Sequence, residues 1–195
     1  MAIKPILFNT KMVRAILDGR KDATRRIVKG FIPDDAVWGY TAFTPKGYIS
    51  CRGTFADGYG EKFFKLPCES GDILYVRETW KKAPNGYYYY EDWQKDDIAD
   101  VTKWKPSIHM PKEAARIWLK VTDVRVERLQ EITEVQAQAE GCNSGLLTGA
   151  CTARGQFEDL WNSTIKKSDI DRYGWDANPW VWEIEFDRCE KPEGV

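Results

Sequence analysis

Residues 71–80 read GDILYVRETW. The first two residues of this stretch are typical of a turn, and the eight that follow are rich in the β-branched and aromatic side chains that suit a pleated surface. We therefore expect a core strand over residues 73–80. Asn85 and Gly86 predict a hairpin shortly after it.

The segments on either side of this strand predict short helices and further strands. Asn9 or Thr10 can cap a helix whose apolar residues recur at helical spacing and which ends at Gly19. Alternating apolar and polar positions predict one long strand or two successive strands over residues 116–129. The same alternation predicts a closing strand over residues 180–186.

Two more helices are expected in the C-terminal half. Thr133 with Gln136 three residues later matches the capping-box pattern and opens a short helix that ends at Gly141, which places Glu140 in its last turn. A further helix is predicted by an apolar stripe formed by Phe157, Leu160, Trp161 and Ile165. Residues 30–70 mix glycine, proline and aromatic residues and predict irregular hairpins.

Several short strands with few helices between them predict an α+β fold built on a small barrel or a curled mixed sheet. The chain has 195 residues, which is enough for one sizeable core and short for two. We expect a single domain over residues 1–190, with insertions around 30–68 and 83–112. The tail at 191–195 is expected to fray, and the acidic stretch at 91–100 to form an exposed loop.

Composition excludes several classes of protein. No run approaches the roughly 20 apolar residues that span a bilayer, and residues 1–10 lack the pattern of a signal peptide, so we expect a cytoplasmic protein with no membrane partner. The five cysteines are scattered and the chain has one histidine, His109. Zinc sites need closely spaced thiolates or imidazoles, so we expect reduced thiols, no metal and no cofactor.

The charge is unevenly distributed. The chain carries a net charge of −1, which argues against a protein that coats duplex nucleic acid by charge alone. Residues 1–30 contain eight basic and two acidic residues, a balance of +6, which leaves −7 for the remainder. The N-terminal segment therefore carries either an anion-attracting surface or a solvated basic face.

Within this basic segment, Lys21 and Thr24 lie three residues apart just after a predicted helix end. Lysine is a poor base at neutral pH, but burial or cationic neighbours lower its pKa. It can then accept the proton of a threonine hydroxyl that attacks a carbonyl. The alternative interpretation is a solvated lysine and a threonine in a turn.

Three elements in this order resemble the ASCH domain of the PUA-like superfamily. They are the Gly19-Arg20-Lys21-x-x-Thr24 element, the strand entry at 71–74 and the later helix that begins at Thr133-Glu134 and ends at Glu140. The resemblance spans about residues 3–190 and is greatest to longer phage- and prophage-encoded members, which share stretches like 76–80 and 178–181.

The resemblance implies a PUA-like small mixed β-barrel with flanking helices and a cleft that receives a nucleobase or nucleoside. The family includes RNA-binding modules, reported ribonucleases and an amidohydrolase that removes the acetyl group of N4-acetylcytidine. By motif, the catalytic residues of that enzyme fall on Lys21, Thr24 and Glu140, with Glu134 as the alternative carboxylate. Asp22 departs from the family pattern, and a carboxylate beside Lys21 would raise its pKa and weaken it as a base.

The mechanism that this implies is amide hydrolysis. Lys21 activates Thr24 or a water, and Glu140 handles the proton that the leaving amine requires. Five further residues are candidates for substrate binding: Arg26, Arg77, Glu78, Trp80 and Trp180. Glu78 can bind a base edge or form an ion pair, and the two tryptophans can stack on a base or fill the core.

Two other functions compete with the hydrolase. One is a non-catalytic module that recognises RNA or a modified base, with Arg25 and Arg26 on phosphate. The other is a metal-independent ribonuclease in which Lys21 and the arginines stabilise the transition state. An enclosed nucleoside-sized pocket favours the hydrolase, and an open basic groove favours RNA. The sequence makes no prediction about oligomeric state.

Overall fold

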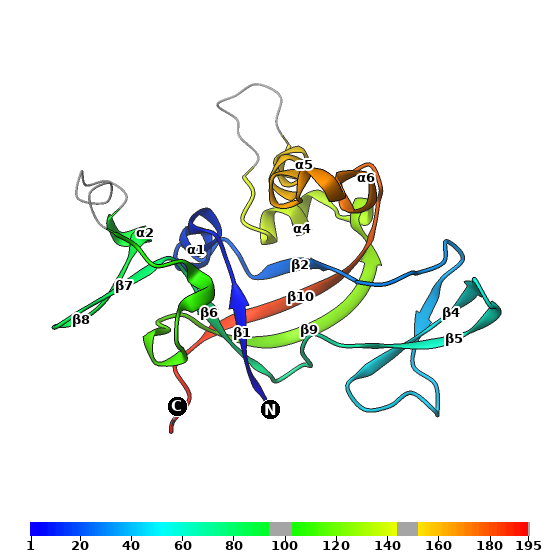
Figure 1. Ribbon diagram of the computed structural model, residues 1–195, viewed down its shortest axis with the longest axis horizontal. Coiled ribbons are helices and arrows are strands. Elements are labelled where there is room, and N and C mark those ends of the chain that lie inside the picture. The colour runs from blue at the N-terminus through cyan, green and yellow to red at the C-terminus, as the bar shows by residue number, and fades with distance from the viewer. Residues whose placement is uncertain (94–102, 144–151, 195) are drawn as a thin grey trace.

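The computed structural model describes residues 1–93, 103–143 and 152–194. Within these ranges the protein has ten strands and five α-helices, which confirms the α+β prediction (Figure 1). The strands are β1 (Ile3–Leu7), β2 (Ala23–Ile27), β3 (Val37–Gly39), β4 (Tyr48–Phe55), β5 (Gly58–Lys65), β6 (Ile73–Arg77), β7 (Trp80–Ala83), β8 (Gly86–Tyr89), β9 (Trp118–Arg128) and β10 (Trp180–Cys189). The α-helices are α1 (Thr10–Leu17), α2 (Tyr90–Trp93), α4 (Glu134–Ala139), α5 (Ala153–Thr164) and α6 (Ile170–Tyr173). Four short 3-10 helices are η1 (Ser107–His109), η2 (Lys112–Ala114), η3 (Leu129–Glu131) and η4 (Lys167–Asp169).

The central sheet has five strands in the order β1-β6-β9-β10-β2. Only the β1–β6 pair is parallel, and the predicted strand over residues 116–129 is the single long strand β9. In the described part of the chain the sheet does not close into a barrel, because β1 and β2 remain its two edges. A side chain links these edges, since the guanidinium of Arg26 on β2 donates to the carbonyl oxygen of Leu7 on β1 at 2.8 Å.

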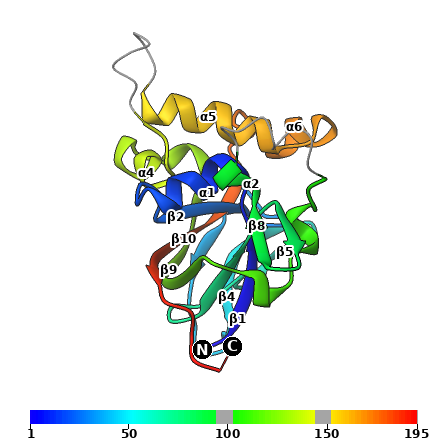
Figure 2. The same cartoon turned by 90° about the vertical axis from the view of Figure 1, so that its left-hand side faces the viewer.

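The two faces of this sheet are covered differently. Alternation along β10 directs Trp182, Ile184 and Phe186 into one core, which also receives α1. Val181 points to the opposite face, where it packs with Phe157 and other residues of a second core. Figure 2 shows α4, α5 and α6 gathered together above the strands. Residues that lie between the sheet and these helices are therefore shielded from water.

Helix termini follow the sequence pattern. The side chain of Asn9 accepts from the backbone N–H of Met12 at 2.9 Å and caps α1, and Gly19 follows the helix with a φ of 71°. Thr133 and Gln136 form the predicted capping box at the start of α4. Both helix predictions are confirmed.

The strand predicted over residues 73–80 is wrong at its C-terminal end. β6 ends at Arg77, and Trp80 begins β7, which pairs with β8 in a separate hairpin. The break falls at Glu78, whose buried side chain pairs with Arg116 at 2.9 Å. The hairpin predicted at Asn85 and Gly86 is confirmed.

Residues 30–70 are more regular than predicted, because β4 and β5 pair over eight residues each. Gly53 and Gly60 face each other in this pair. A Cβ atom at Gly53 would lie 2.6 Å from the Cγ atom of Pro33, so that glycine permits a close approach and does not mark an irregular loop.

Some predictions concern residues that the structure does not describe, namely most of the acidic stretch at 91–100, Cys151 and Val195. The remaining four cysteines are free. Among the described residues, no helix is long and apolar enough to cross a membrane.

Candidate functional site

Lys21 and Glu140 meet although they are 119 positions apart in the sequence. Their backbones form an isolated β-bridge, and Nζ of Lys21 lies 2.6 Å from Oε2 of Glu140. Gly141 makes this approach possible: its φ is 90°, and a Cβ atom there would lie 2.7 Å from the Cβ atom of Ala15. The ends of α1 and α4 are thereby held together, with Lys21 and Glu140 at their junction.

The ammonium group of Lys21 has three acceptors. Nζ donates to the carbonyl oxygen of Ala23 at 2.7 Å, to the carbonyl oxygen of Glu140 at 3.0 Å and to Oε2 of Glu140. Burial lowers the pKa of Lys21, and the Glu140 carboxylate opposes that shift. Asp22 is exposed, and the carboxylate that contacts Lys21 is therefore that of Glu140.

Thr24 lies on β2 next to this pair and is 1% exposed. It lines a pocket of about 220 Å³ between β2 and the helices α1, α4 and α5. The polar wall of the pocket includes Thr24, Arg25, Arg26 and Glu140, and its apolar wall includes Met12, Phe157, Leu160 and Trp161. The structure thus brings Thr24 and Glu140 to one concave site, with Lys21 bound to the carboxylate from behind.

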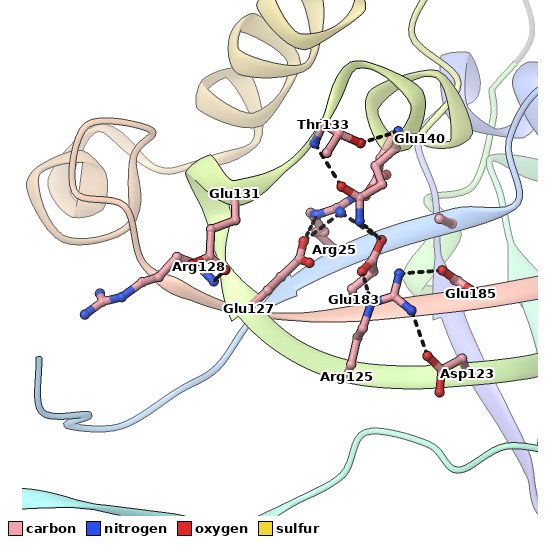
Figure 3. Close-up of polar contacts among 12 residues, drawn as sticks. Arg25, Asp123, Arg125, Glu127, Arg128, Glu131, Thr133, Glu140, Glu183 and Glu185 are labelled. Atoms are coloured by element: carbon pink, nitrogen blue, oxygen red, sulfur yellow. Dashed lines mark hydrogen bonds and ion pairs between the residues drawn. The ribbon is translucent and has the colours of Figure 1, made fainter. Parts of the chain in front are cut away.

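Arg25 organises the carboxylates above the sheet (Figure 3). Its side chain is fully buried and contacts Glu127 at 2.6 Å, Glu183 at 2.8 Å and Oε1 of Glu140 at 3.3 Å. Arg25 and Lys21 therefore bind opposite oxygens of the Glu140 carboxylate. The predicted role of Arg25 in holding phosphate is not compatible with this position, because its guanidinium is enclosed and occupied by three acids.

Glu183 on β10 is the most perturbed carboxyl group of this network. Burial raises its pKa to about 7, the nearby Glu127 acts in the same direction, and Arg25 and Arg125 oppose the shift. Arg125 lies on the other side, with Nε 2.6 Å from Oε2 of Glu183. The network is thus an alternation of acids and arginines that begins at the partly exposed Arg125 and ends at the buried Lys21–Glu140 pair.

The other predicted residues lie elsewhere. Arg26 lines the same pocket as Thr24, and it also lines, with Arg77, a second hollow beside β1. Glu78 is buried against Arg116. Trp80 is 4% exposed and packs on Tyr87, with ring centroids 5.8 Å apart.

Two further candidates have structural contacts. Trp180 packs against Trp38 and under the guanidinium of Arg128, and it does not line the pocket of Thr24. Glu134, the alternative carboxylate, accepts from the backbone N–H groups of Ala153 at 2.6 Å and Arg154 at 3.0 Å, and so caps α5. Glu140 is the carboxylate at the pocket.

Sequence reasoning missed Glu127 and Glu183 and assigned Arg25 to the surface. Alternation on β2 was the available signal, because Thr24 and Arg26 share one face of a strand and Arg25 must take the other. Within the described ranges, no group of three or more histidine, cysteine, aspartate or glutamate residues could hold a metal ion.

Comparison with known proteins found no relative of this chain. No protein-family model matches the chain, and neither a curated protein nor a solved structure matches it.

Proposed function

We propose that this protein is an ASCH-type, PUA-like domain that removes the acyl group from N4-acetylcytidine or a related N4-acylated cytosine nucleoside. The observation that carries the proposal is the buried 2.6 Å contact between Lys21 and Glu140 beside a pocket that Glu140 and Thr24 both line. A curled sheet whose edge strands β1 and β2 approach each other is in keeping with a PUA-like barrel.

The Lys21–Glu140 contact suits acid–base catalysis. Transfer of one proton from Nζ of Lys21 to Oε2 of Glu140 would yield a neutral amine and a carboxylic acid, and burial of Lys21 favours this neutral form. The amine then accepts the proton of Thr24 or of a water as its oxygen attacks the acyl carbonyl. The carboxylic acid gives its proton to the exocyclic nitrogen as the C–N bond breaks. Where Thr24 is the nucleophile, a water then hydrolyses the ester formed on its oxygen, which releases the acyl group as a carboxylic acid and restores the threonine hydroxyl.

The pocket suits a base better than a polymer. Its aromatic and aliphatic residues can contact a planar ring, and polar side chains from β2 and the end of α4 can bind the acyl group. At about 220 Å³ it is smaller than the roughly 300–1,000 Å³ of typical small-molecule sites, so we propose that the acylated base enters while the sugar stays at the mouth. The RNA-binding and ribonuclease alternatives lose one of their expected phosphate contacts, because Arg25 is enclosed.

The test measures the turnover of N4-acetylcytidine, which is monitored by ultraviolet absorbance. Thr24→Val keeps the shape of the side chain and removes the hydroxyl, and Thr24→Ser keeps a hydroxyl. Thr122→Val, at an exposed position of β9, is the matched control.

We expect Thr24→Val to lose roughly 100- to 10,000-fold in rate, Thr24→Ser to recover part of it and Thr122→Val to match the wild type. Absence of turnover by folded wild-type protein, with acetyl and longer acyl groups, would refute the hydrolase. Salt-sensitive binding of single-stranded RNA would then support the recognition module.

A further inference from the structure

The second hollow lies beside the free edge of β1 and shares one lining residue, Arg26, with the pocket of the proposed acyl site. Its volume is about 470 Å³, and its walls come from β1, β2, β6, β10 and the segment before β6. Arg26 and Arg77 are two of its cationic residues. We call it the seam hollow, because it adjoins both edge strands of the open sheet.

Both arginines lie near the C-terminal end of β1. The guanidinium of Arg26 donates to the carbonyl oxygen of Leu7. The backbone of Leu7 pairs with that of Arg77 on β6, and the guanidinium of Arg77 extends to Tyr75 and Ile108. Both arginine side chains line the seam hollow.

Neither guanidinium forms a salt bridge within the described part of the chain. Arg77 donates to two uncharged oxygens, the carbonyl of Ile108 at 3.3 Å and the hydroxyl of Tyr75 at 3.2 Å, and Arg26 donates to a carbonyl. By contrast, Lys4 at the same hollow is paired with Asp72 at 2.9 Å. Glu140 acts on Arg26 only through a longer-range electrostatic interaction, so both guanidinium groups lack a directly bound carboxylate among the described residues.

One polar group of the Arg77 side chain is unpaired among the described residues. Its Nε–H group is buried and has no hydrogen-bond partner among the described residues. Buried side-chain donors nearly always have a partner, and an ion is one usual explanation of an exception. Burial also lowers the pKa of Arg26, which means that its charge is poorly solvated and would gain from a nearby anion.

The remaining walls are mostly apolar and include Pro5, Ile6, Leu74 and Ile184. Inorganic phosphate would leave these walls uncovered, and a volume of about 470 Å³ falls in the roughly 300–1,000 Å³ range of small-molecule sites. Guanidinium groups match the oxygens of phosphate with paired hydrogen bonds. We propose that the seam hollow binds a small phosphate ester, with its phosphate on Arg26 and Arg77 and its organic part against the apolar walls.

Calorimetric titration with phenyl phosphate, inorganic phosphate and phenol tests this proposal without any nucleobase. We expect phenyl phosphate to bind more tightly than inorganic phosphate, and phenol to show no binding. Arg77→Gln should weaken phenyl phosphate binding by about 10- to 100-fold, the size expected for a lost charged contact. Arg77→Lys should lose part of the affinity for phenyl phosphate, because lysine keeps the positive charge but lacks the planar guanidinium group.

Arg52→Gln is the control, since it removes a positive charge from an exposed position on β4. Equal weakening by Arg52→Gln and Arg77→Gln, or no saturable binding to the wild type, would overturn the proposal. Equal affinity for inorganic phosphate and phenyl phosphate would contradict the proposal that the ligand is a phosphate ester. These titrations contain no acylated nucleoside, so the phosphate-ester site stands or fails independently of turnover of N4-acetylcytidine.

Discussion

Arg25 and Arg26 are neighbours on β2, yet their guanidinium groups lie in opposite environments. Arg25 is enclosed on the helix side of the sheet and contacts three carboxylates, and Arg26 is only partly buried and contacts a carbonyl oxygen at the seam hollow. The period of two along a strand separates them. Arg25 therefore stabilises the structure of the acyl site, whereas the positive charge of Arg26 is available to a ligand.

The largest expected effect is on stability. Arg25→Gln leaves Glu127, Glu140 and Glu183 buried without their shared cation, and breaking a buried ion pair costs about 3–5 kcal/mol. Arg26→Gln leaves no carboxylate unpaired and should cost at most about 2 kcal/mol. Urea denaturation of both variants measures the difference in unfolding free energy. Equal losses of unfolding free energy in the two variants would contradict the different roles of Arg25 and Arg26.

The next effect is on the dependence of stability on pH. The pKa of Glu183 is raised to about 7 in the folded protein from 4.5, so the folded state binds more protons between these values. The free energy of unfolding should therefore fall as the pH rises from about 4.5 to 7 and level off above it. Denaturation of wild type and Glu183→Gln across this range is the measurement. The variant should show a flatter profile, and parallel profiles would contradict the assignment.

A smaller effect concerns the helix that presents Glu140. Thr133→Ala removes the N-cap of α4, and Thr152→Ala removes the N-cap of α5. Each should cost about 0.5–2 kcal/mol in thermal or urea denaturation. Because α4 ends at Glu140, Thr133→Ala should reduce acyl hydrolysis more than Thr152→Ala, which affects only the apolar wall that α5 contributes to the pocket. A similar loss of activity in Thr152→Ala would show that general destabilisation, and not the position of Glu140, explains the effect.

Local pattern predicted much of the fold. The caps of α1 and α4, the long strand β9 and the hairpin at Gly86 follow from short-range signals that tertiary structure did not override. The strand at 73–80 was predicted too long, because local β propensity does not reveal that Trp80 pairs with Tyr89 in a separate hairpin. Sheet order and the open edges of β1 and β2 are likewise products of long-range pairing that no local pattern encodes.

The residues of the candidate site likewise divide into those that local sequence predicts and those that only the folded chain brings together. Lys21 and Thr24 are close in sequence, and their chemistry suggested a pair. Glu140 entered only through the resemblance to the ASCH domain, because no spacing rule connects positions 119 apart. Glu127 and Glu183 were missed because they lie on the different strands β9 and β10, and only the folded sheet brings them to the guanidinium of Arg25.

The most direct measurement compares Glu140→Gln with Glu127→Gln in kcat/KM for N4-acetylcytidine. Both variants remove a carboxylate from Arg25, but only Glu140 also contacts Lys21. Our account predicts that Glu140→Gln loses roughly 100-fold or more, and that Glu127→Gln stays within a few-fold of the wild type. Equal losses in the two variants, or full activity in Glu140→Gln, would contradict the assignment of Lys21 and Glu140 as the acid–base pair.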